Sequence, residues 1–238
     1  MWKNVLSKMK QALLDIIFPK TCLGCKKEGS WLCEDCIATL DIQNWSLCPV
    51  CQKRVLDFKT CKYCRQKTRL AGLFVPLSYE NPLIKMAIRQ FKYEPFVKEL
   101  SLPLSYIIIS HLNLIESPSF DDNFILVPVP LYKSRLRWRG YNQAEEIAKE
   151  LSKNLAIPLE KNILIKIKNT LLQAELKGDE RWNNMAKAFL CQNPERIKGK
   201  KILLVDDVYT TGATMEECAR VLKGAGAREV WGMVVARG

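Results

Sequence analysis

Two carboxylates and a hydroxyl-rich turn follow one apolar segment near the C-terminal end of the sequence. Residues 202–205 are apolar, Asp206 and Asp207 come directly after them, and a turn with Gly212 leads into a helical segment. Backbone N–H groups at the start of a helix, with the positive end of its dipole, bind anions such as phosphate. Gly212 allows the backbone to approach such an anion closely. Vicinal hydroxyls of a ribose would suit the paired carboxylates, at the strand end where open α/β sheets bind ligands. The predicted contacts are Asp206 and Asp207 for the ribose and Thr210, Thr211, Gly212, Ala213 and Thr214 for the phosphate.

Two simpler interpretations of this turn remain open at the level of sequence. Thr214 and Glu217 have the spacing of a helix-capping box, which needs no ligand. The two aspartates could also bind Mg²⁺ directly or belong to an ordinary turn.

Eight of the ten cysteines form four CxxC pairs in the first third of the chain, a pattern typical of zinc ribbons. Two pairs supply the four thiolates of one tetrahedral Zn²⁺, with no open position for catalysis. Sequential pairing gives two compact structural sites, although spacing alone leaves an interleaved arrangement open. The sequential sets are Cys22, Cys25, Cys33 and Cys36 for one ion and Cys48, Cys51, Cys61 and Cys64 for the other.

The cysteine-rich segment is also basic and aromatic, so it has a second interpretation as a docking surface. Basic groups interleaved with aromatic rings can follow a phosphate backbone and stack on bases. A purely structural ribbon with a solvated basic face is the simpler alternative. The residues concerned are Lys26, Lys27, Lys53, Arg54, Lys59, Lys62, Arg65, Lys67 and Arg69, with Trp31, Trp45, Phe58 and Tyr63.

Apolar strands that alternate with amphipathic helices must position the acidic turn. Residues 124–130, 201–205 and 230–235 form continuous apolar runs, which are typical of parallel strands covered on both faces. Helical patterns separate them at 141–155 and 214–223, and another strand is expected at 73–77 with helices at 83–91 and 96–114. The fold class is therefore α/β with a Rossmann-like parallel sheet. The predicted domains are an N-terminal helix and double zinc ribbon over residues 1–70, and an α/β domain over 71–238. The latter comprises a hood or connecting segment, 71–119, and a core, 120–238.

Composition limits the class of protein further. The chain has 238 residues and a formal net charge of +12, which two zinc-bound thiolate quartets would reduce to about +8. A basic protein favours a phosphate-bearing partner. No apolar run reaches the roughly 18–20 residues of a membrane span. Asp15 interrupts the N-terminal apolar run and no cleavage pattern follows, so the sequence predicts a short amphipathic helix there and a cytoplasmic location.

The acidic turn resembles the phosphoribosyl-pyrophosphate (PRPP) loop of type I phosphoribosyltransferases, and nearly the whole chain resembles the ComF family. That competence-associated group combines such a domain with an N-terminal double zinc ribbon. Further resembling segments are residues 127–130, residues 139–144 with the sequence Arg-Gly-Tyr-Asn-Gln-Ala, and Gln173 with Arg181 and Asn184.

The resemblance implies roles for individual residues. Asp206 and Asp207 would accept hydrogen bonds from the ribose hydroxyls of PRPP, and residues 210–214 would bind its 5′-phosphate. Arg139 would neutralise the leaving pyrophosphate in catalysis, with Arg181 in a flexible loop, while Mg²⁺ would bridge pyrophosphate and ribose oxygens. The pyrophosphate loop would hold Lys133, Ser134 and Arg135.

The resemblance also implies a function, the handling of single-stranded DNA during natural transformation, with competence proteins such as a ComF-type helicase as partners. Two alternatives stay open. One is an active phosphoribosyltransferase that uses a nitrogen acceptor, although Thr210 stands where some purine-salvage relatives carry an aspartate. The other is a nucleic-acid-binding module without catalysis.

Overall fold

The computed structural model describes residues 19–56, 58–117, 119–170 and 184–238. The predicted N-terminal helix, Gln173 and Arg181 lie outside the described residues. The chain divides into two compact units, Met1–Leu40 and Asp41–Gly238. The first unit holds α2 (Glu34–Ala38) and the first cysteine quartet.

The second cysteine quartet belongs to the same compact unit as the α/β core. Its hairpin consists of β1 (Ser46–Leu47) and β2 (Arg54–Val55). The Thr60 amide donates to the Ala71 carbonyl at 2.7 Å, and the Ala71 amide donates to the Val230 carbonyl at 2.7 Å. Backbone hydrogen bonds thus connect this ribbon to the central sheet. The module boundary that the motifs place at residue 70 stays a prediction.

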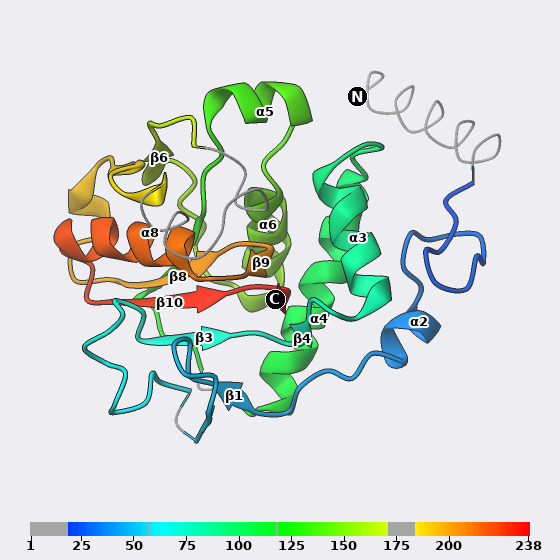
Figure 1. Cartoon of the computed structure of the whole chain (residues 1–238), viewed down its shortest axis with the longest axis horizontal. Coiled ribbons are helices and arrows are strands. Elements are labelled where there is room, and N and C mark those ends of the chain that lie inside the picture. The colour runs from blue at the N-terminus through cyan, green and yellow to red at the C-terminus, as the bar shows by residue number, and fades with distance from the viewer. Residues whose placement is uncertain (1–18, 57, 118, 171–183) are drawn as a thin grey trace. The chain divides into compact units, whose positions relative to one another are not determined.

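The central sheet has the strand order β3-β10-β8-β5, and every neighbouring pair is parallel (Figure 1). Its strands are β3 (Gly72–Phe74), β5 (Phe124–Pro128), β8 (Lys201–Val205) and β10 (Glu229–Met233). The strand β3 comes from the predicted hood or connecting segment, so part of that segment forms an edge of the core sheet. A small parallel sheet of β4 (Leu77–Ser78), β11 (Ala236–Arg237) and β9 (Val208–Tyr209) and an antiparallel pair of β6 (Leu164–Lys166) and β7 (Phe189–Cys191) complete the strands.

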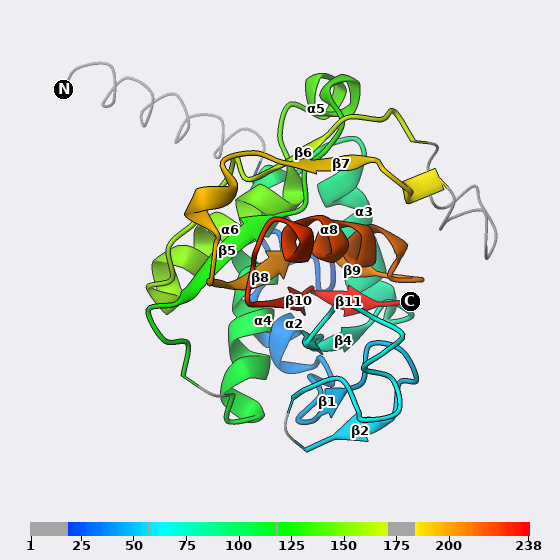
Figure 2. The same ribbon diagram turned by 90° about the vertical axis from the view of Figure 1, so that its left-hand side faces the viewer.

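Helices cover both faces of the central sheet, as the continuous apolar strands predict. In Figure 2, α8 (Ala213–Gly224) lies on one side of the sheet, and α4 (Ser101–Leu114) and α6 (Gln143–Leu155) lie on the other. The other described helices are α3 (Pro82–Lys92) and α5 (Lys133–Arg139), with 3₁₀ turns at Lys98–Leu100 and Pro194–Arg196. Among the described residues, none of the helices combines the length and apolar character needed to cross a membrane.

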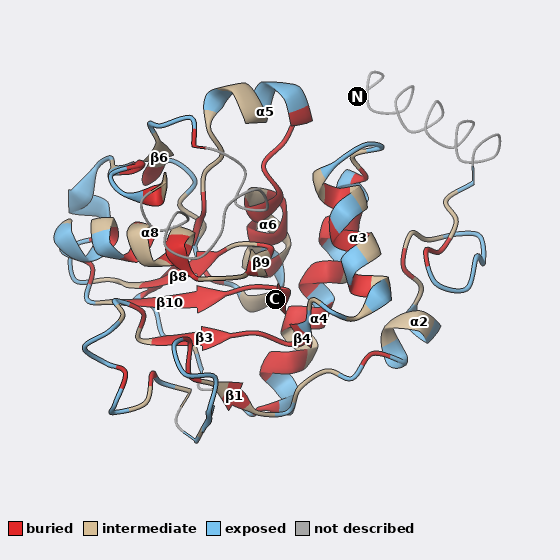
Figure 3. Ribbon diagram, viewed as in Figure 1, coloured by how far each residue is buried: buried red, intermediate tan, exposed pale blue. Residues whose placement is uncertain are grey.

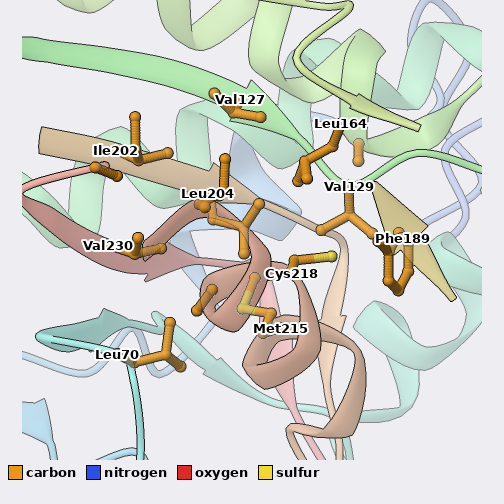
Figure 4. Packing of buried hydrophobic residues seen from close by; sticks show 14 of the residues in the cluster. Leu70, Val127, Val129, Leu164, Phe189, Ile202, Leu204, Met215, Cys218 and Val230 are labelled. Atoms are coloured by element: carbon orange, nitrogen blue, oxygen red, sulfur yellow. The ribbon is translucent and has the colours of Figure 1, made fainter. Parts of the chain in front are cut away.

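The core between α8 and the sheet fixes the helix that starts at the acidic turn. Met215 and Cys218 of α8 face Ile202 and Leu204 of β8, and all four side chains are almost fully buried (Figure 4). Strands of the central sheet are buried except for the partly buried first residues Lys201 and Glu229, while α3 and α8 alternate buried and exposed positions (Figure 3). Alternation along β8 sends Leu203 and Val205 to the opposite face of the sheet. The strand end is therefore held from both sides.

Candidate functional site

The carboxyl ends of β5 and β8 form the floor of a cavity of about 470 Å³. Pro128 of β5 is in register with Val205 of β8, and the Val129 amide donates to the Val205 carbonyl at 2.9 Å. The chain therefore leaves both strands at the same edge of the sheet, where α/β folds bind ligands. The lining residues are Tyr79, Lys92, Tyr93, Val129, Pro130, Leu131, Arg135, Arg139, Asn142, Gln143, Ala144, Lys166, Met185, Asp206, Asp207, Val208, Thr210 and Thr214.

Asp206 and Asp207 both line this cavity, as the sequence predicts, but their surroundings differ. The Asp207 side chain is only 5% exposed, and its Oδ1 lies 2.8 Å from the Lys92 ammonium. Burial and the neighbouring Asp207 carboxylate raise the pKa of Asp206 to about 7. Burial opposes the charge on Lys92, but Asp207 and Asp206 outweigh that effect and raise its pKa. Near neutral pH, the Asp206 carboxylate on the cavity floor therefore readily gains a proton.

The hydroxyl-rich turn follows Asp206 and Asp207 and leads into α8. Gly212 is the N-cap residue with a left-handed φ of 83°, and the Ala213 amide donates to the Thr211 hydroxyl at 3.4 Å. Thr210 and Thr214 line the cavity, whereas Thr211, Gly212 and Ala213 are not among its lining residues.

The capping-box interpretation of this turn is wrong. The helix begins at Ala213, so Thr214 already lies inside it. The Glu217 carboxylate accepts a hydrogen bond from the Lys187 amide at 2.7 Å and pairs with Arg220. Glu217 therefore ties α8 to the segment before β7 and does not cap its own helix.

Arginines from α5 approach the cavity from the β5 side. Arg139 is buried, its guanidinium donates to Gln143, and burial lowers its pKa although Asp207 acts in the opposite direction. Arg135 also lines the cavity and donates to the Thr170 carbonyl at 2.6 Å. Lys133 and Ser134, which resemblance places in the pyrophosphate loop, form the first turn of α5 and do not line the cavity.

Sequence reasoning missed several residues that line the cavity, above all two lysines. Lys92 is the last residue of α3, in the segment before the core. Lys166 ends β6, and burial together with nearby Arg135 lowers its pKa to about 8. An apolar run ends at Lys166, which was an available signal, but nothing in the local pattern around Lys92 relates it to a turn more than a hundred residues away. Tyr79 and Tyr93 reach the cavity from the same segment as Lys92.

The cysteines form two quartets with the sequential pairing. Within each quartet the four sulfurs lie within 4.8 Å of one another, and close pairs are Cys22–Cys33 at 3.6 Å and Cys51–Cys61 at 3.8 Å. Sulfurs arranged tetrahedrally around Zn²⁺, at Zn–S distances of ~2.3 Å, lie about 3.8 Å apart. Both quartets therefore fit structural zinc.

Backbone donors also favour thiolates at these positions. The Cys33 amide donates to the Cys22 sulfur at 3.4 Å. Burial opposes ionisation of Cys22 and Cys48, but N–H donors overcome it and lower their pKa values to about 6 and about 7. Burial and the neighbouring thiols raise the pKa of Cys36 and Cys64 to about 12. A divalent cation is what would let all four sulfurs of a quartet ionise together.

Comparisons with known proteins agree with these two parts. A family model described as phosphoribosyl transferase domain matches residues 136–238, and one described as double zinc ribbon domain matches residues 13–67. Competence protein F of Haemophilus influenzae is 30% identical over 221 residues, which cover 84% of this chain and 95% of that protein. DNA utilization protein YhgH of Escherichia coli K12 is 27% identical over 217 residues, with the same coverage of both chains. Competence protein ComFC of Bacillus subtilis is 28% identical over 207 residues, 82% of this chain and 79% of that protein.

Proposed function

The chain belongs to the ComF family of competence-associated proteins, and from that premise we propose that its cavity binds PRPP or a related phosphoribosyl ligand together with Mg²⁺. Its fold is that of a type I phosphoribosyltransferase with an N-terminal double zinc ribbon. Ligand binding would serve the handling of single-stranded DNA during natural transformation.

One observation carries the ligand proposal: two carboxylates and the start of a helix share a single cavity with four basic side chains. The basic groups are Lys92, Arg135, Arg139 and Lys166. Their charge exceeds that of the two carboxylates, so the cavity suits a ligand with more than one anionic group. Hydroxyl donors of a ribose match the carboxylates, and a 5′-phosphate matches the start of α8.

Within this proposal each part of the ligand has its own contacts. Asp206 and Asp207 accept hydrogen bonds from the 2′- and 3′-hydroxyls, and Thr210 and Thr214 donate to the 5′-phosphate. Arg139, which Gln143 holds in place, interacts with the pyrophosphate. Residues 211–213 form the tight turn before α8 and supply backbone N–H groups for the 5′-phosphate. The family resemblance adds Lys133, Ser134 and Arg135 as contacts of the pyrophosphate.

Magnesium would be held chiefly by the ligand. Among the described residues, only the two cysteine quartets bring together three or more side chains of types that bind metals. Mg²⁺ commonly uses one or two carboxylates plus substrate phosphates, and Asp206 fits that pattern because Lys92 already pairs with Asp207. When bound, the ion would neutralise charge on the pyrophosphate.

Transfer of the phosphoribosyl group to a nitrogen acceptor is a second candidate function. Tyr79 and Tyr93 line the same cavity from the segment before the core, on rings against which a planar acceptor could stack. Release of pyrophosphate from PRPP in the presence of an acceptor, and its loss in the Asp206→Asn/Asp207→Asn variant, would support this candidate.

The DNA-handling part of the proposal rests on relatives and on the second ribbon. Two relatives carry competence in their names and one carries DNA utilization. Tyr63 is 78% exposed beside Lys62, and Lys53, Lys59 and Arg65 of the same ribbon are exposed. Such a surface can contact both bases and phosphates of a single strand. Affinity for an oligothymidylate should then fall as salt rises, with a slope of about −0.7 per contacted phosphate, and a salt-independent affinity would refute this part.

The proposal also includes a compartment and partners. Two quartets of thiolates held for zinc require a reducing environment, so the chain would act in the cytoplasm. Competence proteins such as a ComF-type helicase are the partners that family membership suggests.

Calorimetric titration of the zinc-loaded chain with PRPP and Mg²⁺ tests the ligand proposal. Saturable binding is expected in the wild type and should be lost in Asp206→Asn/Asp207→Asn. A matched control is Asp121→Asn/Asp122→Asn, an adjacent pair just before β5 at the other end of the sheet, where Asp121 pairs with Lys201 at 2.8 Å. Equal binding by both double variants, or no binding by the folded wild type, would contradict the proposal.

A further inference from the structure

The second cysteine quartet is in direct hydrogen-bond contact with the turn that opens α8. Pro49 lies between Cys48 and Cys51, and its carbonyl accepts from the Tyr209 hydroxyl at 3.3 Å and from Arg237 Nη2 at 3.0 Å. Arg237 Nη1 also donates to the Cys48 carbonyl at 3.5 Å. These residues all belong to the compact unit Asp41–Gly238. The quartet therefore touches the acidic-turn region through its own backbone.

Tyr209 transmits this contact to Gly212. The tyrosine is 6% exposed, and the Arg237 guanidinium covers its ring at 5.0 Å. A Cβ built on Gly212 would clash with the hydroxyl of Tyr209, so the hydroxyl that reaches Pro49 lies directly against the backbone of the turn. The ring thus spans the space between the quartet and the N-cap of α8.

A second contact holds the same helix from the other end of the ribbon. Glu216, in the first turn of α8, accepts from the Thr68 hydroxyl at 2.6 Å and from the Arg69 amide at 2.7 Å. Thr68 follows Cys64 by four residues. The ribbon therefore contacts the chain before Gly212 through Pro49 and the chain after Gly212 through Thr68 and Arg69.

Apart from its backbone hydrogen bonds at Thr60 and Ala71, the ribbon that provides these contacts has little regular structure to hold it. Its hairpin strands β1 and β2 have two residues each, and much of the segment between them and Leu70 is exposed. Small ribbons of this kind depend on zinc for their folded conformation. Occupation of the quartet is therefore expected to fix the position of the Pro49 carbonyl.

We propose that zinc at Cys48, Cys51, Cys61 and Cys64 controls ligand affinity in the cavity, with Tyr209 as the positioning residue between them. With the quartet filled, Pro49 and Thr68 hold the start of α8 in the conformation that binds phosphate. With the quartet empty, that segment becomes mobile and affinity falls. The effect on affinity rests on the proposed phosphoribosyl site, whereas the effect on the turn does not.

Coupling of this kind is reciprocal. If zinc strengthens ligand binding by some factor, the ligand must strengthen zinc retention by the same factor. The first quartet lies in the other compact unit and is expected to show no such effect.

Hydrogen exchange of the ligand-free chain tests the structural half. Cys61→Ser removes a ligand of the second quartet, and Cys33→Ser, at the corresponding position of the first quartet and equally half-buried, is the matched control. Amides of residues 208–214 should exchange about tenfold faster in Cys61→Ser and at the wild-type rate in Cys33→Ser. Equal exchange in the two variants would overturn the proposal.

Zinc release tests the coupling without a cysteine variant, and it covers the case in which Cys61→Ser fails to fold. A chromogenic chelator is added to the wild type with and without saturating ribose 5-phosphate. One of the two zinc ions should leave more slowly with the sugar phosphate, and Tyr209→Phe should reduce this protection about 2- to 10-fold because one hydrogen bond is lost.

The outcomes separate the two proposals. Ribose 5-phosphate that binds without slowing release of either ion would overturn the coupling and leave the proposed site intact. If neither ribose 5-phosphate nor PRPP with Mg²⁺ binds the wild type, the proposed function fails, and exchange of residues 208–214 alone then decides whether the second quartet holds the turn.

Discussion

The Lys92–Asp207 ion pair gives the sharpest prediction about the cavity floor. Replacing Lys92 by Met removes the ammonium that lies 2.8 Å from a carboxylate only 5% exposed. Breaking a fully buried pair costs about 3–5 kcal/mol because one charge stays buried without a partner. Lys92 is 27% exposed and faces a cavity, so water partly replaces it. We therefore expect a loss of about 2–3 kcal/mol, which lowers the melting temperature by about 4–12 °C for a unit of this size.

A double-mutant cycle identifies the cause of that loss. Asp207→Asn removes the buried charge itself, so Lys92→Met should cost much less in the Asp207→Asn background than in the wild type. Thermal unfolding of the four zinc-loaded proteins at one pH gives the coupling energy directly. Additive effects of the two substitutions, or a melting temperature unchanged in Lys92→Met, would refute the assignment of a strong ion pair.

Three further predictions concern pH, the turn and the core. Burial and Asp207 raise the pKa of Asp206 to about 7, although Lys92 opposes the shift, so the contribution of Asp206 to stability falls as pH rises from about 4 to 7. In denaturant unfolding, the stability of Asp206→Asn relative to the wild type should therefore increase between pH 5.5 and 8. A stability difference that stays constant with pH would contradict this sign. Gly212→Ala forces an alanine to a φ of 83° against Tyr209, so it should cost about 1 kcal/mol or more and weaken ribose 5-phosphate binding, while unchanged calorimetry would count against a role of this turn. Leu204→Ala empties a fully buried position between the sheet and α8 and should cost about 2–5 kcal/mol in guanidinium unfolding, and a loss below 1 kcal/mol would mean that this core is not tightly packed.

The sequence predicted the central strands and helices because the pattern of apolar residues within each segment largely determines its secondary structure. The run at 201–205 is β8 to the residue, and the helix expected at 214–223 is observed at Ala213–Gly224. Continuous apolar strands indicated a sheet covered on both faces, and the CxxC spacing indicated the sequential quartets. In each case the residues that determine the structure are close together in the sequence.

Features that depend on distant segments escaped prediction. Gly212, the N-cap of α8, lies against the Tyr209 hydroxyl, and that hydroxyl donates to the Pro49 carbonyl of the distant ribbon. Lys92, the last residue of α3, comes within 2.8 Å of Asp207 only through the tertiary fold. Neither relation leaves a periodic pattern in the sequence. That Thr210 and Thr214 line the cavity while residues 211–213 are not among its lining residues is likewise a property of the folded turn.

A crystal structure of the zinc-loaded chain with PRPP and Mg²⁺ would test the central claim most directly. We expect the 5′-phosphate at the start of α8, beside Thr210 and Thr214, and the ribose hydroxyls on Asp206 and Asp207. The claim would be contradicted by a phosphate bound elsewhere on the chain while the cavity stays empty and Lys92 keeps its pairing with Asp207.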